Sequence, residues 1–374
     1  MTLTPGGGGG TVTGLCIICG NRGLADFILN VGLFLPLGAA LGWRGARFLT
    51  TAALVVAFTV FIETAQLSLI PGRDSNPGDV IANSVGGALG WWLLVRGRPL
   101  AARAGARGSW PALLATVVVL GLLTGGLQLT RPLPPDGTYY TQWAADFPHM
   151  GRFTGEVLSS RLGPLPLEGP PWRIERPDSV RQLLRARAPL EVRVVPDTVP
   201  WGGAPIFSIF EEREGEVLML AQFDSDLVYR YRVLGSRFLL DQPELRAWNL
   251  LEEFEPGRPT TLTVRPDGRA VCLGVGTREQ CGLAFSPGDT WMLLYAPDWL
   301  DPPLRRAVST LWVLGLFLPA GAFVRRRRTA ALSATLAVAG LALGPWVTGF
   351  PLAPVGEMLG AVAGVALGSL LTRR

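Results

Sequence analysis

Long apolar segments constrain the fold of this chain more than any other feature of its sequence. A helix needs about 20 apolar residues to cross a bilayer. Six segments approach that length, and a seventh is shorter and rich in glycine and alanine. Hydrophobic residues make up 48% of the 374-residue chain and charged residues only 17%, a composition typical of membrane proteins. The predicted spans are 24–43, 48–70, 79–95, 110–129, 304–324, 329–348 and 355–371.

Arginine clusters between the spans predict the orientation of the chain. The sequence has no lysine, and its arginines gather in short connections, which is the pattern of cytoplasmic loops. The clusters are Arg44 with Arg47, the arginines from Arg96 to Arg107, Arg325 to Arg328, and Arg373 with Arg374. Placing all of them in the cytoplasm requires seven crossings of the plasma (inner) membrane and leaves the N-terminus outside. The net charge of +5 therefore indicates the lipid bilayer as a partner, and no nucleic-acid partner is predicted.

Residues 130–303 differ in composition, with frequent proline and glycine and no run long enough to span a bilayer. Short β-rich or alternating runs recur along this region, separated by turn signals such as Pro266-Asp267-Gly268. Several short strands at this spacing predict an extracytoplasmic all-β sandwich, and roughly 170 residues are enough for a core of its own. The runs are 190–195, 205–211, 216–222, 226–232, 260–265, 270–275 and 291–296.

The two membrane regions that flank the sandwich echo each other. GLFLPLGA at residues 32–39 returns as GLFLPAGA at 315–322, and DVIANSVGGALG at 79–90 parallels EMLGAVAGVALG at 357–368. Two matches in the same order favour a duplication, whose later copy lacks counterparts of Glu63, Gln66, Arg73 and Asn83. The predicted regions are 1–23, an extracytoplasmic segment; 24–129, four spans; 130–303, the sandwich; and 304–374, three spans that form a degenerate repeat.

Polar residues interrupt the apolar hairpin from Phe61 to Leu94 and recur in the first span. Ionisable groups in hydrocarbon cost about 2.5–3.5 kcal/mol each on insertion scales, so they are rare unless used. Here they are spaced by three or four residues, which places each pair on one helix face. The pairs are Asp26 with Asn30, Glu63 with Gln66, and Asp79 with Asn83. The predicted topology puts all three in one layer of the outer leaflet, with Arg73 in the turn as the cation that bridges them.

Two interpretations of this polar layer remain open. In the first, the side chains only cross-link helices, at about 0.6–2 kcal/mol for each hydrogen bond, and Asp79 caps its helix or complements its dipole. In the second, the layer lines an extracytoplasmic pocket. Glu63 favours the second, because a carboxylate among apolar neighbours suits a general acid or base. The hypothetical catalytic residues are Glu63 and Asp79, and the predicted binding residues are Asp26, Asn30, Gln66, Arg73 and Asn83.

Residues 22–96 resemble the VanZ-like family. The resemblance rests on the motif order and flanking spans, namely Asp26/Asn30, Phe34-x-Pro36-x-Gly38, Glu63-x-x-Gln66, Gly72-Arg73, Asp79, Asn83 and Gly86-x-x-x-Gly90. It implies a membrane protein associated with teicoplanin resistance, whose chemistry is not established. The functional residues that it implies are Glu63, Gln66, Arg73, Asp79 and Asn83. Residues 304–371 resemble the family without those polar residues, so no second active site is predicted there. Gly86 and Gly90 form a GxxxG pattern, which favours helix packing over ligand contact.

The predicted sandwich resembles concanavalin A-like or laminin-G-like domains. The resemblance rests on residues 205–232 and 257–282, and such domains bind glycans, peptides or sterols, or act as hydrolases, so the fold alone does not choose a function. Asp224 and Asp226 match acidic loops that bind Ca²⁺ in some of these domains. Two carboxylates fall short of six to eight oxygen ligands, so a turn that caps itself is favoured. No metal or other cofactor is predicted, and Ca²⁺ at this loop is the alternative.

The four cysteines fall into two local pairs. Cys272 and Cys281 are predicted to form a disulfide, because the topology places them outside the cytoplasm, where disulfides persist; a buried free pair is the alternative. Cys16 and Cys19 form a lone C-x-x-C, which is a poor predictor of zinc on its own. A small disulfide and two reduced thiols are both compatible with that motif.

These features predict a VanZ-like membrane protein that recognises or modifies a component of the cell envelope, such as a glycan, a peptidoglycan precursor or a lipid-linked group. The resemblance implies a link to glycopeptide antibiotic resistance. The sandwich would capture the ligand by carbohydrate or peptide binding, and the polar layer would bind or act on part of it. One alternative is a membrane-embedded enzyme that uses Glu63 and Asp79 as acid and base. Another is a non-catalytic adaptor that binds an envelope protein through its sandwich.

Overall fold

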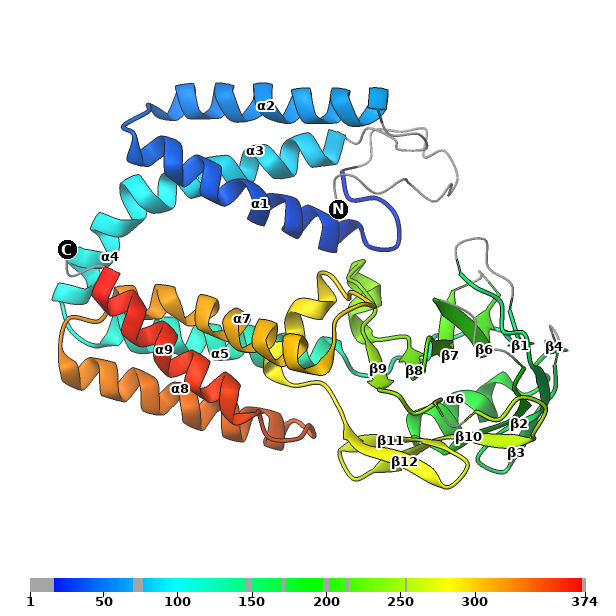
Figure 1. The fold of residues 1–374 in the computed structure, drawn as a ribbon. Helices are drawn as coiled ribbons and strands as arrows, with labels where there is room; N and C mark the ends of the chain where they lie inside the picture. Colours follow the sequence, from blue (N-terminus) through cyan, green and yellow to red (C-terminus); the bar gives the residue numbers. More distant parts are fainter. Residues whose placement is uncertain are drawn as a thin grey trace.

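The computed structural model describes residues 17–69, 77–145, 150–169, 172–197, 202–212, 215–252 and 254–371. These residues form two groups of helices and a separate all-β region (Figure 1). The two helix groups lie alongside each other, and the β region extends from one end of them (Figure 1).

The first helix group consists of α1 (Gly23–Trp43), α2 (Phe48–Leu69) and α3 (Pro77–Trp92). A loop was expected after the third span, but α3 continues through a π-helical turn (η1, Leu93–Gly97) into α4 (Arg98–Ala106). The reason is local, because arginine, leucine and alanine are strong helix formers and a proline stands in the first turn of α4, where it is tolerated.

The second helix group consists of α5 (Trp110–Leu129), α7 (Pro302–Ala322), α8 (Arg327–Val347) and α9 (Val355–Leu371). In the described part of the chain, four helices are long and apolar enough to cross a membrane, namely α1, α2, α5 and α8. Helices α3 and α9 are shorter, and α7 carries the charged pair Arg305 and Arg306 near its N-terminal end. Seven helices thus occupy the seven predicted spans, and four of them meet the criterion of length and composition by themselves.

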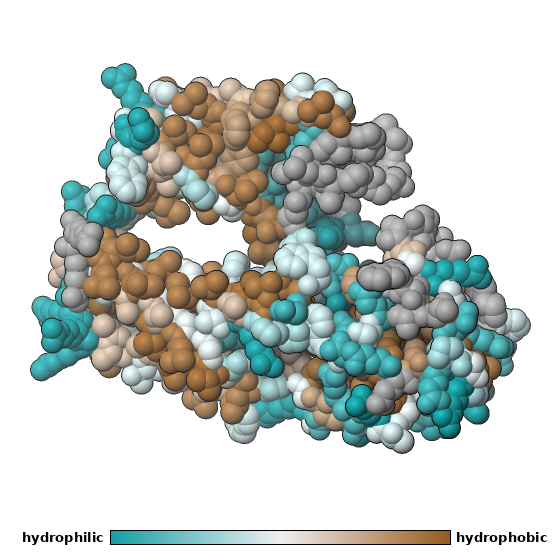
Figure 2. Space-filling model, viewed as in Figure 1, coloured by the Kyte–Doolittle hydropathy of each residue, from teal (hydrophilic) through white to brown (hydrophobic). Residues whose placement is uncertain are grey.

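The helix surfaces are apolar on the outside. Figure 2 shows hydrophobic residues over both helix groups and a more hydrophilic surface over the β region. Large side chains stand exposed on several helices, including Leu49 at 79%, Phe61 at 67% and Leu122 at 62%. Soluble monomers rarely expose contiguous apolar surface of this extent, so the helices are those of a membrane protein.

The β region contains two antiparallel sheets of six strands each, in the orders β4-β1-β6-β7-β8-β9 and β12-β11-β10-β5-β2-β3. Their apolar faces share one core, which includes Val192 and Leu262 from one sheet and Leu218 and Leu220 from the other. The strands are β1 (Tyr139–Trp143), β2 (Glu156–Leu162), β3 (Leu165–Leu167), β4 (Trp172–Arg173), β5 (Leu190–Val195), β6 (Gly203–Glu211), β7 (Glu216–Phe223), β8 (Asp226–Tyr231), β9 (Glu244–Ala247), β10 (Thr260–Asp267), β11 (Ala270–Val275) and β12 (Arg278–Leu283). The predicted sandwich-like region is confirmed.

One predicted strand is wrong. Residues 291–296 were expected to be extended, but the chain forms the 3-10 helix η3 (Pro287–Leu293) and then a loop. Ser286 and Asp289 make a reciprocal capping box at its start, with Pro287 in the first turn, and such a box favours a helical turn over a strand. Two further helical elements, α6 (Pro177–Arg185) and η2 (Leu234–Phe238), were not predicted.

The pair α1 and α3 packs in the same register as the pair α7 and α9. A Cβ at Gly86 or Gly90 of α3 would collide with a backbone carbonyl of α1, that of Val31 or Leu35. In α9 the matching glycines face the matching carbonyls of α7, Gly364 against Leu314 and Gly368 against Leu318. Close backbone contact at small residues is typical of membrane helices. The shared register supports the predicted duplication.

The connections that carry arginine clusters lie at one end of both helix groups. The α1–α2 connection, α4, the α7–α8 connection and the end of α9 are together at the end opposite the β region (Figure 1). The N-terminal ends of α1, α3 and α9 and the C-terminal ends of α2, α5 and α8 lie toward the β region (Figure 1). We call these the arginine end and the sandwich end.

Candidate functional site

Side chains of α1 and α3 meet at the sandwich end of the first helix group. Asn30 Nδ2 donates a hydrogen bond of 2.8 Å to Asp79 Oδ1. Asp26 lies one turn before Asn30 on α1 and is exposed. Hydrogen bonds to an ionised carboxylate are stronger than those between neutral groups. The structure therefore joins members of two of the three predicted pairs.

The third pair lies on the inward face of α2. Glu63 is 7% exposed and Gln66 is 6% exposed, and together with Val55 they belong to the buried stripe of this helix. The stripe faces α3, because a Cβ at Gly87 would collide with the Val55 side chain. A buried carboxylate on a mostly apolar helix is costly in a membrane, which makes Glu63 a functional-site hypothesis.

Asn83 lies one turn after Asp79 on α3 and is 4% exposed. Its Oδ1 is buried and has no hydrogen-bond partner in the part of the chain that the structure describes. An unsatisfied buried acceptor costs about 1–3 kcal/mol, and such groups in native structures need an explanation. A bound molecule that donates a hydrogen bond would supply one.

The predicted bridging cation, Arg73, falls within residues 70–76 and lies outside the described residues. Its role therefore stays a prediction. Asp26, Glu63 and Asp79 all take part in interactions, so none of these carboxylates is isolated. Each of α1, α2 and α3 thus carries a carboxylate with an amide one turn away, and of these groups Asn30 and Asp79 are in contact. Carboxylate and amide oxygens accept hydrogen bonds from N–H and O–H donors.

The second helix group has its own polar cluster at the matching place, which sequence reasoning missed. Glu357, the counterpart of Asp79, is 2% exposed in the first turn of α9. Its Oε2 accepts a hydrogen bond of 2.8 Å from the Gly288 backbone N–H, and its other oxygen accepts one from the Ser286 hydroxyl. Both donors belong to the segment that opens η3. The carboxylate thus holds a piece of this chain by an amide and a hydroxyl.

Asp289 of η3 is bound by α7. Arg305 Nη2 lies 2.8 Å from Asp289 Oδ2, and the Ser309 hydroxyl donates to Asp289 Oδ1 at 2.8 Å. Burial alone would raise the pKa of the Asp289 carboxyl, but the Arg305 charge and these hydrogen bonds hold it below its usual range. The alignment of the two octapeptides places Arg305 opposite Arg22 and Ser309 opposite Asp26. Extending the octapeptide alignment in this way was the one sequence observation that pointed to Arg305 and Ser309.

The α1 counterpart of Arg305 also binds the region between the helix groups and the sheets. Arg22 Nη2 lies 2.9 Å from Asp241 Oδ2, and the backbone N–H groups of Leu24 and Ala25 donate to the Leu239 carbonyl at 3.2 and 3.3 Å. Asp241 in turn accepts from the Ala296 N–H at 2.9 Å. The start of α1 and the start of α7 are therefore each attached through an arginine–aspartate pair.

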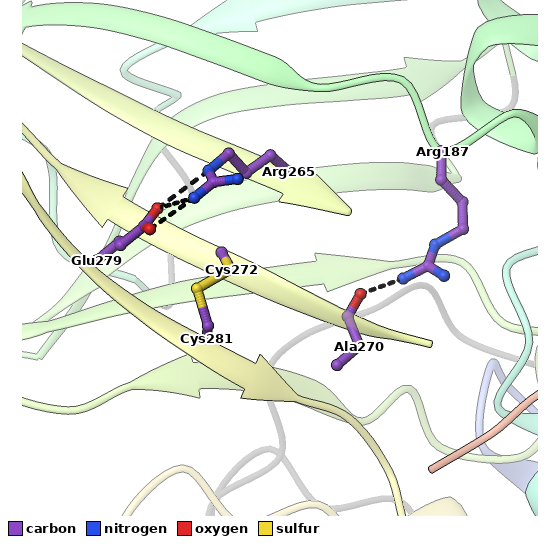
Figure 3. Close-up of a disulfide and its surroundings, with 6 residues drawn as sticks. All are labelled: Arg187, Arg265, Ala270, Cys272, Glu279 and Cys281. Carbon is purple, nitrogen blue, oxygen red and sulfur yellow. Dashed lines mark hydrogen bonds and ion pairs between the residues drawn. A yellow bond between two sulfur atoms is a disulfide. The ribbon is translucent and has the colours of Figure 1, made fainter. Parts of the chain in front are cut away.

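The predicted disulfide between Cys272 and Cys281 is confirmed and joins the neighbouring strands β11 and β12 (Figure 3). Asp267 lies close enough to form a metal-ligating group with them, but a disulfide offers no thiolate to a metal. Cys19 is also disulfide-bonded, whereas Cys16 lies outside the described residues. Of the two interpretations of the C-x-x-C motif, the oxidised one holds for Cys19.

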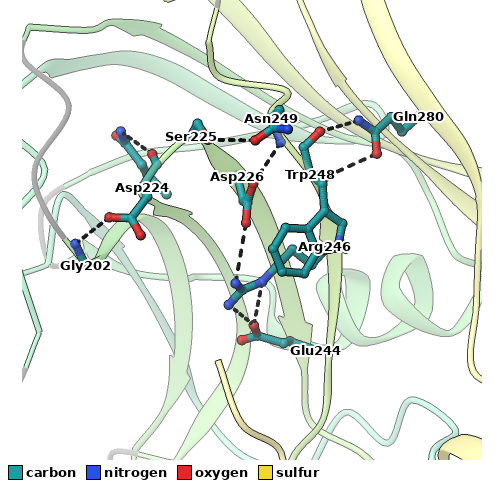
Figure 4. A network of polar contacts seen from close by, with 10 residues as sticks. Gly202, Asp224, Ser225, Asp226, Glu244, Arg246, Trp248, Asn249 and Gln280 are labelled. Carbon is teal, nitrogen blue, oxygen red and sulfur yellow. Dashed lines mark hydrogen bonds and ion pairs between the residues drawn. The ribbon is translucent and has the colours of Figure 1, made fainter. Parts of the chain in front are cut away.

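The acidic loop of the sandwich has protein partners (Figure 4). Asp224 Oδ1 accepts from the Gly202 N–H at 3.0 Å. Asp226 is 5% exposed, accepts from the Asn249 N–H at 2.8 Å and lies 3.4 Å from an Arg246 nitrogen. Burial raises the pKa of the Asp226 carboxyl despite these donors. The arrangement is a turn tied by its own side chains, the interpretation favoured by the sequence, and the predicted Ca²⁺ alternative remains untested.

Comparison with known proteins identifies one part of the chain. The family model described as VanZ/LLP1 matches residues 10–98, which include α1, α2, α3 and the polar residues on them. No curated protein matches the chain, and no solved structure matches it. The resemblance of the sandwich to concanavalin A-like and laminin-G-like domains therefore has no support beyond its two antiparallel sheets. The matched region and the apolar helices together make this chain a membrane protein with a VanZ-like domain.

Proposed function

We propose that this protein recognises a component of the cell envelope at the first helix group, from a multi-pass position in the plasma membrane with residues 130–303 outside the cytoplasm. The ligand class is a peptidoglycan precursor, glycan or lipid-linked group. The VanZ-like domain is the basis for the membrane setting. We also propose that the protein contributes to resistance against glycopeptide antibiotics, because these drugs act on envelope precursors.

The observation that carries the proposal is the likeness between the two polar clusters. In the second group, Glu357 binds an amide N–H and a hydroxyl of the chain itself. In the first group, Asp79 stands at the matching place beside Asn30, with the buried Glu63 on a third helix. The same helix frame with more acceptors suits a separate molecule that offers amide and hydroxyl donors. Peptidoglycan precursors carry both, in their peptide and their sugars.

The residues have distinct roles in this proposal. Asp79, held by Asn30, accepts a donor from the ligand, as Glu357 accepts from Gly288. The Oδ1 of Asn83, which has no partner among the residues that the structure describes, accepts a second donor. Glu63 lies within the helix group, where it binds the ligand or exchanges a proton with it. Arg73 would hold an anionic part of the ligand, such as a carboxylate or phosphate.

The experiment measures binding of a lipid-linked muropeptide and of its soluble pentapeptide to the full-length protein in nanodiscs. Glu63→Gln and Asp79→Asn keep size and polarity but remove a charge, and each is expected to weaken binding by about tenfold or more, since hydrogen bonds to charged groups contribute about 1.5–3 kcal/mol. Thr64→Val is the matched control on α2, because Thr64 is exposed and donates only to its own helix at Val60.

Normal binding by both carboxylate variants, at wild-type expression and melting temperature, would refute the proposal. Mass analysis of the recovered probe separates recognition from catalysis. Conversion of the probe by the wild type but not by Asp79→Asn would favour the membrane-embedded enzyme. Teicoplanin susceptibility of cells that express each variant tests the resistance function directly.

A further inference from the structure

A cavity of about 400 Å³ lies between the two sheets at the end of the sandwich that faces the helices. Its size is that of a small-ligand site, for which about 300–1,000 Å³ is usual. We call it the inter-sheet slot. Its apolar walls come from both sheets and include Leu218, Tyr229, Tyr231, Val264, Val271 and Leu283.

Two tyrosines of β8 give the apolar slot a small polar component. Tyr229 and Tyr231 lie two residues apart on one face of the strand, with their ring centroids 5.4 Å apart. Burial raises the pKa of both phenols, so both stay protonated at physiological pH and are available as hydrogen-bond donors. The slot is therefore mostly apolar with a few directed polar groups, the usual make-up of a ligand site.

Arginines line the rim of the slot, and three of them contact only neutral acceptors. Arg187 donates to the Gly268 carbonyl at 2.9 Å and to that of Ala270 (Figure 3). Arg269 donates to the carbonyls of Trp346 and Phe350 at 2.6 and 3.2 Å, and Arg131 to that of Thr348. Within the described residues, none of these three guanidinium groups pairs with a carboxylate, whereas Arg265, also at the slot, pairs with Glu279. The rim thus carries positive charge that no carboxylate of the described segments neutralises.

Arg187 occupies a backbone position that favours glycine. It follows the C-cap of α6 with φ of +55°, and its N–H returns to the Leu184 carbonyl at 3.1 Å. Helices commonly end on such a left-handed residue, which is usually glycine because a Cβ is disfavoured there. An arginine at this place carries a conformational cost that the guanidinium group on the rim would explain.

The slot lies where two candidate membrane spans end. Arg131 follows α5, and Gly349 and Phe350 follow α8, and all three residues line the slot. Next to it Trp346 is 55% exposed, with Arg269 stacked over its ring at 5.0 Å. Tryptophan and arginine at helix ends are typical of the membrane–water interface. Lipid would therefore be the apolar molecule nearest to the mouth of the slot.

We propose that the inter-sheet slot binds an anionic lipid of the bilayer, with an acyl chain between the sheets and the phosphate of its headgroup against Arg131, Arg187 and Arg269. Burial of the chain removes apolar surface from water, and guanidinium groups match phosphate in charge and geometry. This site is separate from the polar layer of the first helix group and goes beyond the function proposed for it.

The experiment uses the full-length protein in a non-ionic detergent with phosphatidic acid and phosphatidylcholine of identical chains. Native mass spectrometry counts the retained lipids. Retention of phosphatidic acid is expected to exceed that of phosphatidylcholine by about tenfold, the effect of one charged hydrogen bond or more. Equal retention of the two lipids would overturn the proposal, as would competition by glycerol phosphate as effective as that by the complete lipid.

Two variants test the two halves of the site. Arg187→Gly removes a rim charge at a position whose backbone suits glycine, so the fold should persist while phosphatidic acid retention falls by about tenfold. Ala284→Trp fills the slot, which Ala284 lines, and should abolish retention of the acyl chain. Arg193→Gln removes an exposed arginine from β5, outside the slot, and should change nothing. Wild-type retention in both slot variants would overturn the proposal.

Discussion

At the scale of single residues, the buried ion pair between Asp289 and Arg305 permits a quantitative prediction. Asp289 is 6% exposed and binds Arg305 at 2.8 Å. Asp289→Asn leaves the arginine without its counter-charge, and breaking a buried pair costs about 3–5 kcal/mol. The melting temperature of the detergent-solubilised protein should fall clearly. Asp298→Asn, which neutralises an exposed aspartate a few residues on, should leave the melting temperature unchanged.

The same pair predicts how the effect depends on pH. The pKa of Asp289 is lowered in the folded state, below an ordinary value of about 3.9. A carboxyl group whose pKa is lower in the folded state than in the unfolded chain stabilises the folded state. This stabilisation is fully present at pH values above the unfolded-state pKa and is lost as the pH falls through the folded-state pKa. The gap between the melting temperatures of wild type and Asp289→Asn should therefore close in strong acid, as the pH falls through the folded-state pKa of Asp289. A gap that widens in acid would contradict the assigned cause.

Individual residues also show where the sequence stops being informative. The sequence was enough to select the candidate residues of the polar layer, because polar groups are unusual in apolar helices; these residues include Asn30, Glu63, Asp79 and Asn83. The partners of Glu357 were not, because Ser286 and Gly288 come from a segment that shows no polar anomaly of its own. Such contacts depend on tertiary packing between residues about 70 positions apart, which neither periodicity nor motif spacing encodes.

At the scale of elements, glycine contacts explain why α1 and α3 lie so close together, and they supply a matched test. Gly86→Ala places a Cβ against the Val31 backbone, which cannot move aside as a side chain can, so the expected cost is about 1–3 kcal/mol. Gly32→Ala is the control, because nothing lies within 4 Å of a Cβ there, and alanine in an open helical position stabilises by up to about 1 kcal/mol. Thermal melting of both variants measures the difference.

The second helix group repeats this test. Gly364→Ala should destabilise as Gly86→Ala does, and Gly315→Ala should be harmless as Gly32→Ala is, because the surroundings of these glycines match in the two groups. Opposite signs for the corresponding variants would argue against a duplicated packing frame.

Elements with strong local signals were predictable from the sequence. Strands β5 and β11 occupy the predicted residues, 190–195 and 270–275, because alternation and turn residues agree there. The predicted strand at residues 291–296 was wrong, because periodicity does not distinguish a strand from a short buried helix in an apolar run. The capping box of Ser286 and Asp289 favours the helix instead. The short edge strands β3 and β4 (Leu165–Leu167 and Trp172–Arg173) were not predicted, because strands of three and two residues are too short to show an alternating pattern.

At the scale of the whole molecule, the β region is attached to both helix groups by similar ion pairs. Arg22 at the start of α1 pairs with Asp241, and Arg305 at the start of α7 pairs with Asp289. Because α1 and α7 are counterparts in the predicted duplication, equivalent helix ends of the two groups contact the β region at the sandwich end. A ligand held between the sheets and one held at the polar layer would therefore lie on the same side of the membrane.

The orientation of the whole molecule can be tested by cysteine labelling in intact cells. The arginine-rich connections that the structure describes, namely the α1–α2 connection, α4 and the α7–α8 connection, belong to the arginine end, opposite the β region (Figure 1), and positive charge is retained in the cytoplasm. Ser159→Cys on β2 and Ala106→Cys at the end of α4 both replace exposed residues. A membrane-impermeant maleimide should label the first in intact cells and the second only after the cells are opened. The disulfide-bonded Cys272 and Cys281 do not react, so the parent protein serves as the blank. Labelling of Ala106→Cys in intact cells, with Ser159→Cys protected, would reverse the topology and place the proposed envelope site on the wrong side of the membrane.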